Sequence, residues 1–513
     1  MIRFLPIFMF LLYFVVGIFI VKDYGISTDE IYSRQDSLAS YVYVLGKGMS
    51  ESKSESVRNA ANNAPNLMTH HDRFYGTALP SITVFIEHLF KFELSSRDIY
   101  LIRHVFTFIN YLVAGIFFYL ILRRRFGNTI IPILGILLYI LYPRFFGESF
   151  YNIKDIMFFS WYLISVYFVL RWLEDDLQNT FLLPAAATLA IATNTRILGI
   201  SVLLLALFFA IAIGVRKKLA YRQIFKTSFM LAMLTFVCYV VITPFTWENP
   251  LKNTIDTFLH FLHFNPWNGR HFYMGEMITR EVPWHYIPVW MGLTIPLFYI
   301  TMFFIGIARK PKHLFDVFFV ALFLCTLLGF IGLHINMYEG WRHSYCIYAS
   351  FLYIAFLGLE RSFAFFRNKR VAFKRGFVCI IAVNMLYLFA WNVVNHPYQY
   401  VYFNIVGRQF AEKNFTLDYW DVSFVDLIHH VLANDNRQNL KFYVGGTYPE
   451  SMLTDAEKER AKWAPLEEAD YYIQDTRLSY KDRVCPPGFV KQTAITVDGM
   501  DISILYKRTA NNE

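Results

Sequence analysis

A short charged segment follows the first apolar run of this chain. The segment ISTDEIYSRQD, residues 26–36, contains three carboxylates and one guanidinium. Charge this close to hydrocarbon is energetically costly, so such residues are candidates for a functional site. A carboxylate can take a proton from a hydroxyl group, and acid–base groups of this kind contribute rate factors of about 10²–10⁴. Asp29 and Glu30 are therefore candidate catalytic residues.

Three further groups of charged residues are expected on the same side of the membrane, near the ends of predicted spans. They are Lys154 with Asp155, Arg196, and the segment YEGWRH with Glu339, Arg342 and His343. Arginine can bind a phosphate through two parallel hydrogen bonds, and lysine can bind it as a point charge. Four groups at one surface favour a shared site over separate interface anchors or structural salt bridges.

The elements that must position these residues are membrane helices. Hydrophobic residues make up 56% of the 513 residues and charged residues only 17%. The first apolar run, about 18 residues long, can cross a hydrocarbon core of about 30 Å. Because no small-residue cleavage site follows it, we expect a retained helix. Ten more runs lie at about 99–121, 128–144, 155–172, 180–195, 198–215, 226–245, 286–307, 313–333, 345–361 and 375–394.

The distribution of basic residues predicts the topology. Basic segments lie at 123–128, 215–226, 308–313 and 360–375, and the positive-inside rule makes them cytoplasmic. The N-terminus is then cytoplasmic, and residues 23–98 form an external loop. The apolar stretch 180–215 has both flanks on the basic side, so it must cross the membrane an even number of times. The polar residues Asn194 to Arg196 supply the break between its two spans. We assign the formal charge of +9 to these loops and to anionic lipid headgroups, not to nucleic acid.

A less hydrophobic tail follows residue 394. We expect a transmembrane catalytic domain over residues 1–394 and a small extracytoplasmic α+β domain over 395–513. Within the tail, the patterns predict an entry turn and an amphipathic helix over 415–434, a helix at 455–464, strands at 439–446 and 469–475, and a hairpin that turns at Asp498–Gly499.

Several stretches of the chain resemble a known family. They are RFFGESFYNIKDIMF (144–158), ATNTRILGI (192–200), EVPWHYIPVW followed by TIP (281–290, 294–296), YEGWRHSYCIY (338–348), and HPYQYVYFN with FTLDYWDVSF (396–404, 415–424). Their order, and the DE pair after the first helix, resemble the GT-C glycosyltransferases, in particular the bacterial protein O-mannosyltransferase and aminoarabinose-transferase-like branch. One departure is Ile153, where the family pattern NPKD has proline.

The resemblance implies inverting transfer of a sugar from a polyprenyl-phosphate-linked donor. In that reading Asp29 is the general base, and Glu30 positions it or the acceptor. Because the two are adjacent, either can be the base. Asp155 matches a second acidic position that orients acceptor or sugar. Lys154, Arg196 and Arg342 are assigned to the donor phosphate, and His343 either shares that role or caps a helix.

The same resemblance implies the partners and the location. We expect a polyprenyl-phosphate sugar as donor, a protein, lipid or glycan as acceptor, surrounding membrane lipids, and no nucleic acid. The resemblance to bacterial members places the protein in the inner membrane with its site and tail facing the periplasm. The sequence identifies neither the sugar nor the acceptor.

No metal ion or other cofactor is predicted as a requirement. His70, His71 and Asp72 superficially resemble metal ligands, but adjacent histidines point apart on a helix or strand. Two other classes of protein remain as alternatives. A secondary transporter would bury its charges near the bilayer midplane and show paired, interrupted segments. A non-catalytic membrane scaffold would leave the four charged groups unexplained.

Overall fold

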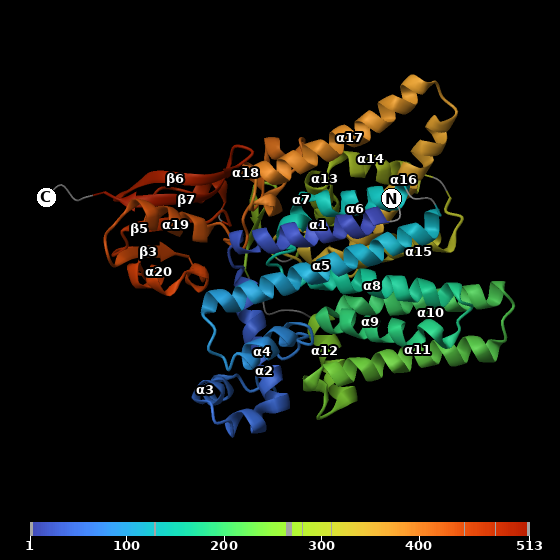
Figure 1. Ribbon diagram of the computed structural model, residues 1–513, viewed down its shortest axis with the longest axis horizontal. Coiled ribbons are helices and arrows are strands. Elements are labelled where there is room, and N and C mark those ends of the chain that lie inside the picture. Colours follow the sequence, from blue (N-terminus) through green and yellow to red (C-terminus); the bar gives the residue numbers. More distant parts are fainter. Residues whose placement is uncertain are drawn as a thin grey trace.

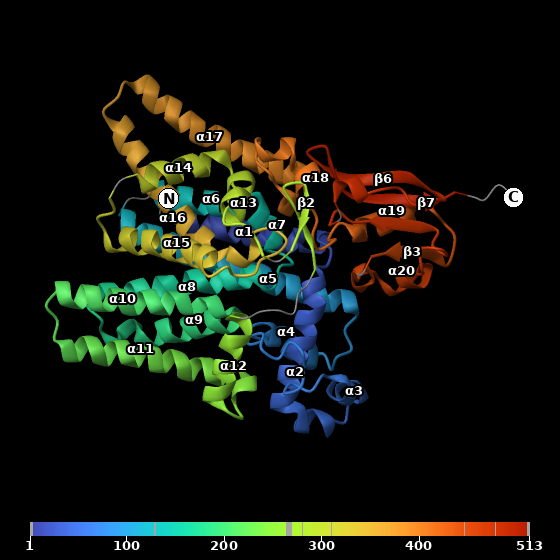
Figure 2. The ribbon, with the colours of Figure 1, turned by 180° about the vertical axis from the view of Figure 1, so that it is seen from behind.

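The computed structural model describes residues 4–127, 130–262, 269–279, 281–308, 310–445, 447–477 and 479–509. Long helices run side by side in one main direction, and the sheet of the tail lies beyond one end of them (Figures 1 and 2). The short helices of the first external loop lie toward the same end. The external loop and the tail therefore meet at one end of the bundle.

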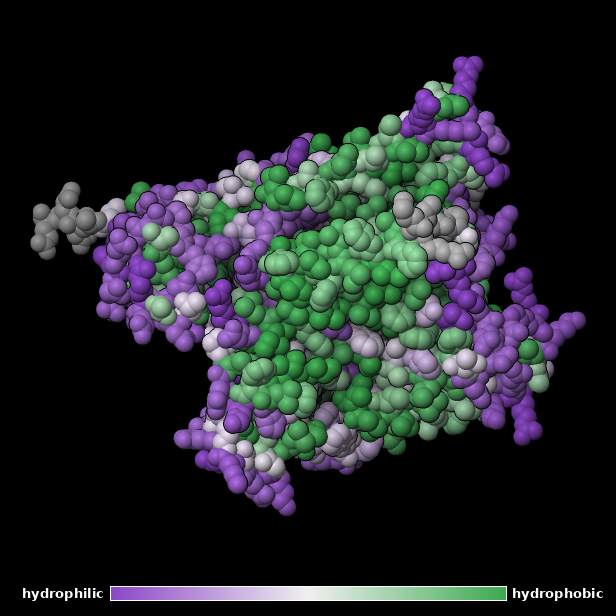
Figure 3. Space-filling model, viewed as in Figure 1, coloured by the Kyte–Doolittle hydropathy of each residue, from purple (hydrophilic) through white to green (hydrophobic). Residues whose placement is uncertain are grey.

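Eight described helices are long and apolar enough to cross a membrane. Figure 3 shows a broad apolar surface over these helices, with polar surface at both ends. The spans are Leu5–Asp23 (containing α1, Leu5–Ile20), Ser96–Phe126 (α5), Asp155–Glu174 (α8), Ile197–Arg216 (containing α10, Ile200–Arg216), Tyr221–Ile242 (α11), Leu314–Gly332 (α15), Cys346–Arg367 (α16) and Val371–Val394 (α17). The prediction of a helical, polytopic membrane protein is confirmed.

The other three predicted spans are shorter or interrupted helices. They are α6 (Ile130–Leu141), α9 (Leu182–Thr195), and the pair α13 (Tyr286–Thr294) and α14 (Leu297–Ile307). Between α13 and α14, Ile295 has an extended backbone. It precedes Pro296, and proline disfavours the helical conformation of the residue before it. The predicted break between two spans is present at Arg196, which is also extended. Asn128 and Arg309 of the predicted basic loops lie outside the described residues.

The external loop forms α2 (Thr28–Ser50), α3 (Glu55–Asn63) and α4 (Pro80–Leu89). α2 begins with a capping box, in which the Ser27 side chain and the Glu30 side chain satisfy free backbone amides. Arg34 of α2 forms an ion pair with the buried Glu87 of α4 at 2.6 Å. The buried Arg103 of α5 donates hydrogen bonds to Ser33 and Thr83. These contacts attach the loop firmly to the bundle end.

Two glycines allow close approach of segments near that end. A Cβ atom at Gly76 would lie 1.6 Å from the backbone oxygen of Asn194, next to the break at Arg196. A Cβ atom at Gly25 would lie 2.1 Å from the backbone oxygen of Val422 in the tail. Any larger residue at either position must therefore push the loop away from its neighbour.

The tail contains a five-stranded sheet in the order β4-β3-β5-β7-β6. Its elements are α18 (Ala411–Asn414), α19 (Phe424–Asn434), β3 (Leu440–Val444), α20 (Asp455–Arg460), β4 (Ala461–Trp463), β5 (Tyr471–Gln474), β6 (Phe489–Val497) and β7 (Met500–Arg508). The predicted hairpin turn is present, with positive φ at Asp498 and Gly499. The small α+β domain is confirmed as a fold, whereas the domain boundary after residue 394 stays a prediction.

One predicted element of the tail is partly wrong. The predicted helix over residues 455–464 ends at Arg460, and Ala461–Trp463 form β4 instead. β4 pairs in parallel with β3, Leu440 opposite Ala461. Backbone hydrogen bonds to a strand far away in sequence outweigh the local helix preference there.

Two further α-helices and two short strands lie among these elements, besides several one-turn 3-10 helices. The α-helices are α7 (Pro143–Glu148) and α12 (Pro250–Leu262), and the strands are β1 (His271–Tyr273) and β2 (Glu276–Ile278). α7 leads directly into the start of α8, where Lys154 and Asp155 lie.

Candidate active site

Four predicted site residues meet at the end of the bundle that faces the loop and the tail. Arg342 Nη1 donates hydrogen bonds to Asp29 Oδ2 and to Asp155 Oδ2, each at 3.2 Å. Arg196 forms an ion pair with the other oxygen of Asp155. Two carboxylates therefore alternate with two guanidiniums in one network, although the four residues come from distant parts of the chain.

Exposure separates the members of this network. The side chain of Asp29 is 25% exposed and that of Arg196 is 20% exposed. Asp155 is fully buried, and the side chain of Arg342 is only 5% exposed. A substrate could therefore reach Asp29 and Arg196 directly, whereas Asp155 lies beneath the two guanidiniums.

The local structure explains how the two carboxylates are held. Asp29 lies in the first turn of α2, and Asp155 begins α8. Carboxylates are favoured at helix N-termini because free backbone amides give that end a partial positive charge. Asn152 accepts a hydrogen bond from the backbone amide of Asp155 at 2.9 Å, and its amide group donates to Glu148 at 2.7 Å.

Three aromatic rings surround the Arg342 guanidinium. Its central carbon lies 4.9 Å from the ring centre of Tyr338, 5.0 Å from that of Tyr419 and 5.1 Å from that of Trp420. Arginine over an aromatic face is attracted by the ring quadrupole, more strongly where water is excluded. Tyr419 and Trp420 belong to the tail, so the tail contributes directly to the position of a predicted phosphate-binding residue.

The side chains of the adjacent residues Asp29 and Glu30 lie in different environments, one partly exposed and the other fully buried. Glu30 is fully buried, caps α2 through Ser27, and its Oε1 lies 3.0 Å from Nε2 of the buried His104. Its carboxylate is therefore already occupied by structural partners, and the structure does not bring it to the exposed side of the network.

Lys154 and His343 lie beside the network rather than in it. The Lys154 ammonium lies 3.9 Å from Asp36 Oδ2 and 4.5 Å from the ring centre of Tyr75. The ring of His343 packs edge-on against Tyr338 at 4.6 Å. Burial, with the positive charge of nearby Arg342, holds the pKa of His343 well below its usual range, so its imidazole is neutral at pH 7.

Sequence reasoning missed several residues of this region. Besides Tyr419 and Trp420, they include Glu148 and Asn152, whereas Glu339 belongs to the charged YEGWRH segment that the sequence had indicated. Burial raises the pKa of Glu339 to about 8, so this group carries a proton at neutral pH. Glu148 and Asn152 lie within a stretch that resembles the family, which was the available signal. Tyr419 and Trp420 also lie within such a stretch, residues 415–424, but the sequence favoured a packing corner there and did not show that Arg342 is their partner.

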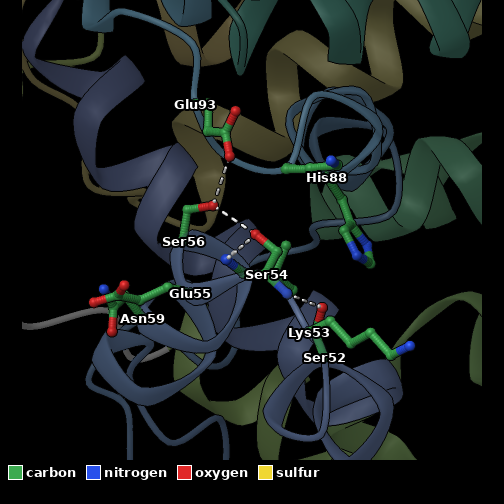
Figure 4. Close-up of a pocket in the computed structure, with 10 residues that line it drawn as sticks. Ser52, Lys53, Ser54, Glu55, Ser56, Asn59, His88 and Glu93 are labelled. Atoms are coloured by element: carbon green, nitrogen blue, oxygen red, sulfur yellow. Dashed lines mark hydrogen bonds between the residues drawn. The ribbon is translucent and has the colours of Figure 1, made fainter.

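An open cavity lies elsewhere among the described residues. It has a volume of about 770 Å³ and lies between the end of α2, the start of α3 and the segment after α4 (Figure 4). Ser56 bridges Ser54 and Glu93 across it. It is lined by Ser52, Lys53, Ser54, Glu55, Ser56, Val57, Asn59, His88, Lys91 and Glu93. The ion-pair network is therefore not part of this cavity.

Comparisons with known proteins bear on the same region. Residues 86–247 match the family model described as dolichyl-phosphate-mannose-protein mannosyltransferase. The matched segment contains Lys154, Asp155 and Arg196, while Asp29 and Arg342 lie outside it. Over this segment the match confirms the predicted resemblance to protein O-mannosyltransferases.

Solved structures with a similar chain path include ArnT from Cupriavidus metallidurans. The form bound to undecaprenyl phosphate has a TM-score of 0.49 and 11% identity, covering 99% of each chain. The apo form has a TM-score of 0.46 and 12% identity, covering 97% of each chain. No curated protein matches this sequence significantly.

Proposed function

We propose that this protein is a membrane glycosyltransferase that moves a sugar from a polyprenyl-phosphate-linked donor to an acceptor hydroxyl, with inversion. The observation that carries the proposal is the network at the bundle end, where the partly exposed Asp29 pairs with Arg342, and Arg342 and Arg196 share the buried Asp155. The family model matched by residues 86–247 is named for a polyprenyl-phosphate sugar donor, which supports the same donor class here.

In this mechanism Asp29 is the general base. Its carboxylate takes the proton of the acceptor hydroxyl while the acceptor oxygen attacks the anomeric carbon of the sugar. The bond from that carbon to the phosphate oxygen breaks, and the lipid phosphate leaves with the electron pair. A single displacement of this kind inverts the anomeric centre. Asp29 takes this role in preference to Glu30 because only Asp29 of the pair is exposed.

Arg196 and Arg342 stabilise the charge that develops on the leaving phosphate. The side chain of Arg196 is 20% exposed, so its guanidinium can meet an anionic ligand, and charge-assisted hydrogen bonds to phosphate are strong. Asp155 holds the two guanidiniums at a fixed spacing and is a positioning residue in this scheme. Lys154 adds positive charge at the side of the site.

We further propose the inner membrane of a bacterium as the location, with the site and the tail facing the periplasm. The basic segments at 215–226 and 360–375 are the support for this orientation. The acceptor is a protein, lipid or glycan hydroxyl. A general base of this type needs no metal ion for the transfer step.

The function is tested by incubating purified protein with a sugar-loaded polyprenyl phosphate and measuring free polyprenyl phosphate. We expect time-dependent release that increases when a suitable acceptor is added. A transporter or a scaffold should release none, and the absence of release across donors with different sugars would contradict the proposal. In sealed right-side-out vesicles, external protease should cut the tail and stop the release; an intact tail would contradict the orientation.

Replacing Arg196 by lysine should weaken donor binding. The substitution keeps the charge but removes the planar two-point contact with phosphate. Losing a charge-assisted hydrogen bond costs about 1.5–3 kcal/mol, which corresponds to roughly a ten- to hundredfold loss of affinity. The measurement is a titration with polyprenyl phosphate. Arg437→Lys, an exposed arginine of the tail, is the matched control. Unchanged affinity in Arg196→Lys would assign Arg196 to a structural ion pair alone.

A further inference from the structure

A second group of polar side chains lies two turns along α2 from Asp29. Asp36 is the central member, and its side chain is only 4% exposed. One carboxylate oxygen, Oδ1, lies 2.9 Å from His70 Nε2. The other oxygen, Oδ2, is buried and has no hydrogen-bond partner among the described residues. The closest cation to it is the Lys154 ammonium at 3.9 Å, beyond hydrogen-bond distance. A buried carboxylate oxygen without a partner is costly, so this atom requires an explanation.

The segment opposite Asp36 holds His70 and Asp72 in a defined position. The backbone amide of His70 donates to Asn66 O at 2.8 Å, and that of Tyr75 donates to Asp72 O at 3.0 Å. Consecutive turns of this kind fix the two side chains relative to each other. The close contact of Gly76 with Asn194 then anchors the segment to the bundle. The side chains of His70 and Asp72 are 16% and 28% exposed.

We propose that Asp36, His70 and Asp72 bind a divalent transition-metal ion such as Zn²⁺. One ligand atom from each residue lies within 4.8 Å of the other two. Zinc bonds to imidazole nitrogen and carboxylate oxygen at about 2.0–2.2 Å, so small side-chain rotations bring all three into its coordination sphere. Three protein ligands leave a fourth position open. The ion also supplies the missing partner for Asp36 Oδ2.

His71, whose position next to His70 had argued against a metal site, is not one of the three proposed ligands. His71 is 75% exposed, and its ring bonds to Asp72 rather than turning toward Asp36. The two adjacent histidines do point apart, as expected from their spacing. The metal-binding arrangement instead joins His70 to a carboxylate of α2, which sequence spacing does not reveal.

The position of the ion beside Lys154 gives it a further consequence. The Lys154 ammonium forms an ion pair with Asp36 at 3.9 Å. A metal ion that binds Asp36 neutralises this carboxylate and adds positive charge, so Lys154 becomes available to an anionic ligand. This step concerns the surroundings of the proposed donor site, but metal binding itself does not depend on the proposed glycosyltransferase function.

The test uses full-length protein in detergent, treated with EDTA to remove bound metal. It is titrated with Zn²⁺ alone, and binding is measured by isothermal titration calorimetry. We expect one saturable site per chain. His70→Gln and Asp72→Asn, at partly exposed positions, should each lower the affinity at least tenfold, and Asp36→Asn should do the same. His430→Gln, at an exposed position of the tail, is the matched control and should bind Zn²⁺ as the unmodified protein does.

Two results would overturn the inference. The first is the absence of saturable binding to the unmodified protein. The second is an affinity that His70→Gln and Asp72→Asn leave unchanged. Thermal unfolding of each variant without metal shows whether it is folded, and Zn²⁺ should raise the midpoint only where the site is intact, because binding to the folded state stabilises it. Neither readout requires turnover, so a failure here leaves the proposed sugar transfer unaffected.

Discussion

Asp29→Asn should lower the turnover of sugar transfer by about 10²–10⁴-fold, the range typical of a lost general base. Asparagine has nearly the same shape and can still accept the hydrogen bond that Arg342 donates to this position. It cannot accept a proton at neutral pH. The substitution therefore removes the basicity of the side chain and leaves its packing largely unchanged.

Binding and stability should separate this effect from misfolding. The ion pair of Asp29 is partly exposed, and such pairs contribute about 0–1 kcal/mol to stability. We therefore expect the variant to retain its thermal unfolding midpoint within a few degrees. Donor affinity should be maintained, because the variant keeps both guanidiniums. The measurements are turnover at saturating donor and acceptor, donor titration and thermal unfolding.

Glu30→Gln is the informative comparison for the same pair of residues. Glutamine can still complete the capping box, but it removes the charge that faces His104. We expect a lower unfolding midpoint with turnover within a few-fold of normal in the folded fraction. Asp455→Asn, at an 87% exposed position of the tail, controls for the general loss of a carboxylate. Near-normal turnover in Asp29→Asn would remove this residue from the chemistry.

Asp155→Asn should be strongly destabilising, in contrast to Asp29→Asn. Asp155 is fully buried and pairs with both Arg196 and Arg342. Removing one partner of a buried ion pair costs about 3–5 kcal/mol, because the remaining charge stays buried without compensation. Turnover should fall as well, since the two guanidiniums lose the group that sets their spacing. Denaturant unfolding in detergent measures the first effect.

A second substitution distinguishes a pair effect from a general packing defect. Combining Asp155→Asn with Arg342→Gln removes one of the uncompensated charges. The double variant should lose less stability than the sum of the two single losses, as expected for residues in one network. Additive losses, or an Asp155→Asn variant as stable as the unmodified protein, would contradict the positioning role of Asp155.

The sequence by itself determined the architecture of the membrane part. All eleven apolar runs form helices in the described residues, one of them interrupted at Ile295, because a chain in hydrocarbon must satisfy its backbone hydrogen bonds within each segment. The break at Arg196 and the hairpin turn at Asp498–Gly499 also follow from local patterns. Charge placement at span ends indicated which residues could share a site.

Only the tertiary structure decided how those residues are used. Asp29 and Glu30 are neighbours in sequence, yet one is partly exposed beside Arg342 and the other is buried against His104. Consecutive residues on a helix point in different directions, and what each one meets depends on helices packed from elsewhere in the chain.

The same reason accounts for the other residues that sequence reasoning missed. The tail residues Tyr419 and Trp420 enclose Arg342, and Asp36 lies beside His70, although no sequence period connects either set. The short strand β4 likewise forms only because β3 lies next to it. Hydropathy and turn propensity act over a few residues and so can be read along the chain. Ion pairs, ring contacts and strand pairing act between segments brought together by folding, so only the packed structure determines them.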